Sequence, residues 1–283
     1  GGHDPGALGP KVSEAELVLD VALRLERVLR KNPTFEVALT RRTNAFVPLE
    51  RRTVIANRFG ADLFLSIHAN ASRNTTARGV ETYFLNFASS ADAEAVAARE
   101  NAASGRSMRD STDIVKAITL NNKVDESREL ARVVQAALVK GARSDDQLIR
   151  DLGVKQAPFV VLVGANMPSV LAEISFITNP TDAQRLRTAA SRQRIAESLA
   201  EAVFGYQRVE RALDERWLLA DLLFAGAGFL LLRRAWRSGT PESADGAELV
   251  ETAARRPDWL FGLLALTAWL AGMQAASWLG AGV

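Results

Sequence analysis

His68 is the residue whose type and position most directly suggest metal chemistry in this sequence of 283 residues. It follows the strand-like segment Leu63–Ile67, and in open α/β sheets ligands bind beyond the carboxyl ends of the strands. The segment alone favours a simpler interpretation, a hydrogen-bonded histidine at the edge of a sheet, because a lone histidine is a weak signal. The chain has only two histidines, His3 and His68, and no cysteine. Any metal site must therefore also use carboxylates.

Glu173 is a carboxylate inside an apolar strand-like segment, Val170–Phe176. An ionised carboxylate in such a place costs several kcal/mol unless it has a partner or a function. An ion pair with one of the many arginines is the structural alternative. The position favours a functional carboxylate, a candidate for acid–base chemistry.

Glu14 is the third candidate, at the start of a predicted helix. Ser13 and Glu16 form the pattern of a capping box, in which Glu16 can reach back to the cap. Glu14, at the first helical position, is then free to point beyond the helix end, which makes it the better ligand candidate. Attraction of a carboxylate to the helix dipole is the alternative, and this segment alone favours that alternative.

The composition excludes several classes of protein. With 48% apolar and 24% charged residues the chain is expected to fold. A formal charge of +2 without a basic stripe gives no reason to expect a nucleic-acid partner. The absence of cysteine excludes disulfide scaffolds, thiolate zinc sites and cysteine nucleophiles.

The elements that would position these residues alternate between helix and strand periods, which predicts an α/β fold with a mainly parallel or mixed sheet and helices on both faces. We expect strands at Phe35–Leu39, Asp62–His68, Gly79–Leu85, Phe159–Val163 and Ser169–Phe176. We expect helices from Ser13 to Leu29, Pro48 to Phe59, Ala91 to Ala103, Val124 to Lys140, and closing helices within Asp182–Arg211, whereas Ser104–Lys123 is polar and irregular with one short apolar patch.

The composition changes near residue 206, because all five tryptophans lie after residue 216. We therefore predict two parts, residues 1–206 as the domain with the candidate site and residues 207–283 as a membrane region. Residues 259–283 carry no charge and are long enough to cross a bilayer, and residues 217–232 are a shorter candidate span. Two core helices of a small soluble domain are the alternative.

Taken together, these segments resemble the zinc-dependent N-acetylmuramoyl-L-alanine amidases of the cell-division type, in order from residue 1 to about residue 205. The matching segments are Gly1–Ala7, Glu14–Leu23, Thr40–Arg41 with Leu49–Asn57, Leu65–Ala71, Gly79–Leu85 and Met167–Pro180. The resemblance implies Glu14 and His68 as Zn²⁺ ligands and Glu173 as the catalytic carboxylate. It also implies peptidoglycan as substrate and the bond between N-acetylmuramic acid and L-alanine as the bond that is cut, and Asn70 is a candidate for substrate binding.

The family's first zinc-binding histidine stands immediately before the Gly-Gly pair, which here would be the residue before Gly1. We expect the parent chain to carry this histidine, and we expect the 283 residues without it to bind zinc poorly and to be inactive. His3 is a geometrically unattractive substitute, since it lies three residues further along a turn.

Residues 88–127 resemble the insertion that blocks the site of division amidases until an activator protein displaces it. Asp110, Asp113 and Glu126 are the carboxylates that we consider for the open zinc position. A solvated surface excursion is the alternative. The resemblance places the protein in the periplasm or at the cell surface, in wall remodelling or daughter-cell separation, and the two candidate spans would anchor it to the membrane.

Two other functions stay open at this point. A different zinc hydrolase of wall peptides, such as a carboxypeptidase, would use the same metal chemistry and release D-alanine. A non-catalytic, membrane-anchored wall-binding protein would need no complete metal site.

Overall fold

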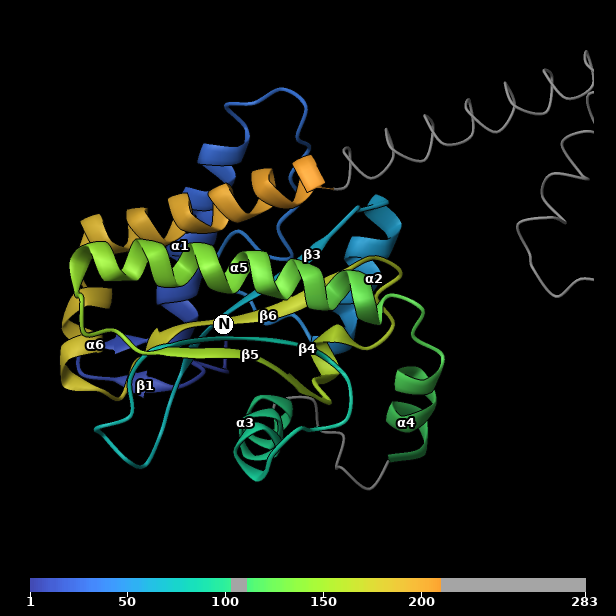
Figure 1. Ribbon diagram of the computed structural model, residues 1–283, viewed down its shortest axis with the longest axis horizontal. Coiled ribbons are helices and arrows are strands. Elements are labelled where there is room, and N and C mark those ends of the chain that lie inside the picture. The colour runs from blue at the N-terminus through green and yellow to red at the C-terminus, as the bar shows by residue number, and fades with distance from the viewer. Residues whose placement is uncertain (103–110, 210–283) are drawn as a thin grey trace, which may run out of the picture. The chain divides into compact units, whose positions relative to one another are not determined.

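A four-stranded sheet in the order β3-β6-β4-β5 forms the centre of the computed structural model, which describes residues 1–102 and 111–209 (Figure 1). Its strands are β3 (Phe64–Asn70), β6 (Ser169–Phe176), β4 (Val80–Leu85) and β5 (Asp151–Ala157). The pairs β3–β6 and β4–β5 are parallel, whereas β4 runs antiparallel to β6. The sheet is therefore mixed, and every residue of the inner strand β6 is buried.

Helices cover both faces of this sheet, as expected for the fold class (Figure 1). The side chains of Val170, Ala172 and Ile174 in β6 pack into one apolar cluster, and Leu171 between them packs into the other. The first cluster includes residues of α1 (Glu14–Leu29), α5 (Val124–Asp145), α6 (Pro180–Leu186) and a last helix, residues 189–209. The second includes residues of α2 (Leu49–Phe59), α3 (Ala91–Asn101), α4 (Ser111–Thr119) and the 3₁₀ turn η2 (Val160–Leu162).

The start of α1 follows from its sequence. Two short strands, β1 (Leu8–Gly9) and β2 (Val12–Ser13), form a hairpin directly before it. Ser13 is the N-cap, and its hydroxyl accepts a hydrogen bond from the amide of Glu16 at 3.4 Å. Leu17, Val21 and Leu25 then recur at every fourth position and are buried, which fixes the face that α1 turns to the sheet.

The helix α2 also begins and ends where its residues require. Pro48 is its N-cap, a place where a missing amide hydrogen costs nothing. Gly60 ends it with a φ of +71°, a left-handed conformation that glycine adopts without strain. The N-terminal end of α2 packs on η2, where the Thr53 hydroxyl donates a hydrogen bond to the carbonyl of Val163 at 3.0 Å.

Four features of the chain differ from the sequence-based expectations. Residues 35–39 are not a strand: among the described residues no strand pairs with them, and Phe35 instead packs against the ring of Phe204. Residues 159–163 form η2, so their apolar character reflects burial in the second cluster and not strand structure. The edge strand β5 was missed because its residues are polar or half-buried. The apolar patch within residues 104–123 belongs to the helix α4.

Both predicted membrane spans, residues 217–232 and 259–283, lie outside the described residues. Within residues 1–102 and 111–209, no helix is long and apolar enough to cross a membrane.

Candidate metal centre and active site

Glu14 is held by backbone amides from two separate segments. Its Oε2 accepts a hydrogen bond from the amide of Ala7 at 2.8 Å, and its Oε1 accepts one from the amide of Ala69 at 3.1 Å. The loop before α1 approaches so closely that a Cβ on Gly6 would lie 2.5 Å from Oε2, and Gly6 has a φ of +67°. A glycine is therefore required here, and the carboxylate of Glu14 has a fixed orientation.

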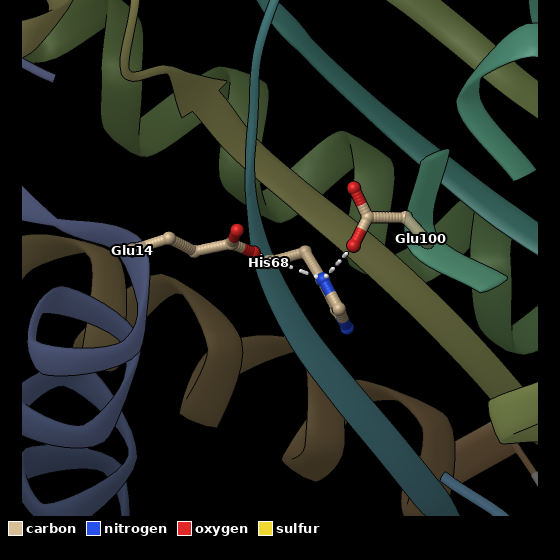
Figure 2. A group of neighbouring side chains, drawn as sticks. All are labelled: Glu14, His68 and Glu100. Carbon is tan, nitrogen blue, oxygen red and sulfur yellow. Dashed lines mark ion pairs between the residues drawn. The ribbon is translucent and has the colours of Figure 1, made fainter. Parts of the chain in front are cut away.

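His68 lies between two carboxylates. Its Nδ1 is 3.0 Å from Oε1 of Glu14 and 2.9 Å from Oε2 of Glu100, which belongs to α3 (Figure 2). Its Nε2 is 3.2 Å from the hydroxyl of Ser66. Burial of His68 disfavours its protonation, but Glu100 and Glu14 outweigh this effect, so the pKa of His68 is well above its ordinary value.

The contact with His68 also shifts the pKa of Glu100. Burial alone would raise the pKa of Glu100, but the positive charges of His68 and Arg99 outweigh burial and lower it. This buried arrangement therefore favours a negative charge on Glu100 and a positive charge on His68.

The donor set of this cluster fits a zinc ion. One ligand atom each from Glu14, His68 and Glu100 lies within 4.8 Å of the others. Nδ1 of His68 is buried and makes no hydrogen bond among the described residues, although two carboxylate oxygens face it. One imidazole nitrogen and two carboxylate oxygens are donors that Zn²⁺ accepts in proteins.

Glu100 was not among the candidates drawn from the sequence. Of those candidates, Glu126 pairs with Lys123 at 3.0 Å and not with the cluster, while Asp110 and the side chain of Asp113 lie outside the described residues. The sequence offered only the resemblance of residues 88–127 to the blocking insertion, and no periodicity within that range singles out Glu100. The contact with His68 is long-range, so only the fold reveals it.

Glu173 faces the same side of the sheet as His68. The two residues are register partners in the parallel pair β3–β6, and Glu81 is the partner of Glu173 in the antiparallel pair β4–β6. Glu173 is fully buried, and neither of its carboxylate oxygens makes a hydrogen bond within the described part of the chain. Burial, reinforced by Glu100, raises the pKa of Glu173 well above its ordinary value, although His68 acts in the opposite direction.

The structural alternative for Glu173 was an ion pair with an arginine. Within residues 1–102 and 111–209 no ion pair involves this carboxylate. A buried carboxylate with a raised pKa beside a cluster of metal-ligand types is typical of an acid–base residue.

Asn70 and His3 occupy different surroundings. Asn70 lies two residues after His68, across an irregularity in the pairing of β3 with β6, is 1% exposed, and donates a hydrogen bond to Glu81. His3 is exposed and packs its ring 4.2 Å from that of Phe46, so it is not part of the cluster.

The fold and this cluster define a class of protein, an α/β protein with a histidine–carboxylate centre at the carboxyl end of a parallel strand. A family model described as N-acetylmuramoyl-L-alanine amidase matches residues 1–204. The chain belongs to this family.

Individual relatives agree with this assignment. The chain is 37% identical over 212 residues to the N-acetylmuramoyl-L-alanine amidase AmiA of Escherichia coli (strain K12), covering 73% of each chain. It is 32% identical over 208 residues to the amidase LytC of Bacillus subtilis (strain 168), covering 74% of this chain and 34% of LytC. Among solved structures, the catalytic domain of CwlV from Bacillus (Paenibacillus) polymyxa var. colistinus matches with a TM-score of 0.57 at 26% identity, covering 74% of this chain and 94% of that domain. An amidase from Clostridium difficile 630 matches with a TM-score of 0.56 at 27% identity, covering 74% and 92%.

Proposed function

We propose that this protein hydrolyses the amide bond between N-acetylmuramic acid and the L-alanine of the peptidoglycan stem peptide. The observation that supports the proposal most strongly is the placement of Glu173, a buried carboxylate without a partner among the described residues, opposite His68 in register. The family to which the chain belongs, N-acetylmuramoyl-L-alanine amidase, indicates which amide bond is cut.

Zn²⁺ is the metal that we propose for the centre. Glu14 and His68 would hold it, and Glu100 would occupy a further position beside them while α3 is docked. When bound, the ion would polarise the amide carbonyl and lower the pKa of a water molecule.

Glu173 is the residue that we propose to move the proton. A carboxylate that takes a proton from the attacking water and delivers it to the departing alanine nitrogen must have a pKa nearer to neutral than that of an ordinary glutamate. The buried surroundings of Glu173 raise its pKa in that direction. The leaving amine is a poor leaving group, so its protonation is an essential part of the reaction.

We further propose that the site is closed in this structure by α3. Glu100 in α3 makes a close contact with His68, which leaves less room for a substrate carbonyl beside the candidate metal ligands. An activator protein that displaces α3, within the insertion 88–127, would open the site.

The proposed location follows from the substrate. Peptidoglycan lies outside the cytoplasmic membrane, so we propose that residues 1–206 act as the catalytic domain in the periplasm or at the cell surface, in wall remodelling or daughter-cell separation. We propose residues 207–283 as the membrane region, on the strength of their sequence.

Product analysis tests the proposed reaction. A form of the protein that includes the histidine expected before Gly1 is loaded with Zn²⁺ and incubated with isolated peptidoglycan, and the released products are separated and identified by mass spectrometry. We expect stem peptides with a free L-alanine amino group. Release of D-alanine would instead identify a carboxypeptidase, and binding to peptidoglycan without any product would identify a wall-binding protein.

A further inference from the structure

Arg99 spans two hydrogen-bond acceptors beside the proposed active site. Its Nη2 donates to Oδ1 of Asn70 at 2.8 Å, and its Nη1 donates to the backbone carbonyl of Ala71. The next residue, Glu100, contacts His68. The same turn of α3 therefore places a carboxylate at the candidate metal centre and a pair of N–H donors on Asn70 and Ala71.

Asn70 is fixed so that its oxygen must face the site. Its Nδ2 donates to Oε1 of Glu81 at 2.5 Å, and Glu81 also accepts from the hydroxyl of Tyr83 at 2.9 Å and from the ammonium of Lys155. The carboxylate of Glu81 accepts hydrogen bonds from three donors. If the side-chain amide of Asn70 were flipped, its Oδ1 would face the Glu81 carboxylate oxygen, and two acceptors would then be in contact. Asn70 and Glu81 are 1% and 2% exposed, which makes this a rigid, built arrangement.

The two acceptors lie beside the candidate metal ligands and Glu173. Asn70 is hydrogen-bonded to Glu81, and Glu81 is the register partner of Glu173, which is itself the register partner of His68. When α3 leaves, Oδ1 of Asn70 and the carbonyl of Ala71 lose the donors of Arg99. Each acceptor must then take a hydrogen bond from water or from the substrate, and a substrate with N–H groups in the right places would replace water there.

We propose that Oδ1 of Asn70 and the carbonyl of Ala71 form a substrate subsite that accepts two amide N–H groups of the muramoyl-peptide, and that Arg99 occupies this subsite while α3 is docked. Glu81 is the positioning residue, because it fixes which end of the Asn70 amide faces the substrate. Neither acceptor carries a charge, so neutral amides suit the subsite. The inference depends on the proposed amidase function.

A binding experiment tests the subsite without requiring turnover. The probe is muramyl dipeptide, together with analogues that carry an N-methyl group on the alanine nitrogen or on the next peptide nitrogen. Affinities are measured calorimetrically for zinc-loaded Arg99→Met and for Arg99→Met/Asn70→Ala, both with Glu173→Gln to prevent hydrolysis. We expect at least one methylation to weaken binding to Arg99→Met about 10- to 100-fold and to have a much smaller effect once Asn70 is alanine.

Two further results separate the subsite from other roles. If Asn70 only latched α3, removing it in the Arg99→Met background would leave kcat/KM unchanged, whereas we expect a 10- to 100-fold fall. Glu81→Gln keeps Asn70 but weakens the hydrogen bond that orients it, so N-methylation of the probe should reduce affinity less than it does in Arg99→Met alone. This variant keeps the test valid if Asn70→Ala fails to fold. Arg132→Met, on the exposed surface of α5, serves as the matched control for Arg99→Met.

The outcomes distinguish the two proposals. The subsite proposal would be wrong if N-methylation lowered the affinity equally with and without Asn70, or if methylation at neither nitrogen lowered it. Either result would leave the proposed amidase function intact. No binding of muramyl dipeptide to any folded variant would contradict the amidase function itself.

Discussion

At the residue scale, two buried carboxylates of the site, Glu14 and Glu173, have different hydrogen-bonding surroundings. Glu14 receives hydrogen bonds from two backbone amides, which hold its carboxylate in one orientation. Glu173 receives none from the described residues, and burial raises its pKa. Two carboxylates in different surroundings can take different roles in one reaction, a ligand and a proton carrier.

The close approach of Gly6 to Glu14 leads to a prediction with a matched control. In Gly6→Ala the new methyl group would meet Oε2 of Glu14, in addition to the strain of a left-handed φ. Gly60→Ala has a similar φ but no neighbour within 4 Å of the added Cβ. We expect both variants to lower the melting temperature, and we expect only Gly6→Ala to weaken zinc binding, by about 10- to 100-fold in a chelator competition assay. Equal zinc affinity in the two variants would show that Glu14 is not a ligand.

The individual site residues differ in how far the sequence predicts them. Glu173 stands out because a carboxylate within Val170–Phe176 is anomalous, and Glu14 stands out because the capping pattern leaves it free. Glu100 has no such local signal. Its significance depends on the end of α3 reaching His68, a contact between residues that are 32 positions apart, which local spacing does not encode.

At the scale of elements, α3 is held mainly by its polar end. Ala93 and Ala97 are its fully buried apolar residues, and such small side chains bury little area. Its last turn makes the polar contacts, from Arg99 to Asn70, from Glu100 to His68, and between Asn101 and the backbone just before and at the start of η2. A helix attached in this way can be released by disrupting a few polar contacts.

Glu100→Ala tests this release. Removing the carboxylate frees the space beside His68, and we expect the basal rate of peptidoglycan hydrolysis to rise about 10-fold or more. The same substitution removes a candidate donor, so zinc affinity should fall while the rate rises. Glu94→Ala, exposed on the same helix, is the control and should change neither quantity. A lower rate in folded Glu100→Ala would show that Glu100 supports the reaction and does not block the site.

Helix α1 carries a carboxylate whose effect on stability should depend on pH. Hydrogen bonds from Arg42, with further help from Arg30, lower the pKa of Glu26 despite its burial. A carboxylate with a lowered pKa in the folded state contributes stability above its unfolded pKa, near 4.5, and that contribution is lost as the pH falls through the folded value.

Unfolding experiments between pH 7 and pH 3 can detect this contribution. We expect Glu26→Gln to be less stable than the wild type at pH 7, with a difference that shrinks as the pH falls. Glu16→Gln, on the exposed side of α1, should leave the pH profile unchanged. A constant difference between Glu26→Gln and the wild type over this range would contradict the assignment.

The elements also show why sequence patterns succeed or fail. Every residue of β4 and β6 is buried, and the residues of β3 are buried or half-buried, so these strands are mainly apolar. The edge strand β5 contains Asp151, Gly153 and Lys155 and therefore has no such run. Residues 159–163 have the apolar run without the strand, because burial and not secondary structure determines hydrophobicity.

At the scale of the whole molecule, the site is assembled from segments that are far apart in the chain. Register between β3, β6 and β4 brings His68, Glu173 and Glu81 to one face, and α1 and α3 add Glu14 and Glu100. The fold class was predictable from the alternation of periods. The strand order, which decides that these residues meet, follows from long-range packing and was not.

The charges that flank the candidate spans predict the membrane topology of the full chain. Arg233, Arg234, Arg237, Arg255 and Arg256 lie between residues 217–232 and 259–283, and only Arg208, Arg211 and Arg216 lie in the stretch before them. Basic loops stay in the cytoplasm, so residues 233–258 should face the cytoplasm and the amidase domain the other side. An epitope inserted in residues 238–246 should resist protease added from outside, and its cleavage from outside would contradict this topology.

The most direct test of the central claim is the hydrolytic rate of Glu173→Gln. In the Arg99→Met background, in which we expect the site to be open, the rate at which stem peptides with free L-alanine are released is compared with and without this substitution. Glu197→Gln, exposed on the last helix, is the control. We expect Glu173→Gln to keep its fold and bound zinc and to lose activity by about 100- to 10,000-fold. Near-normal release by a folded, zinc-loaded Glu173→Gln would contradict the account.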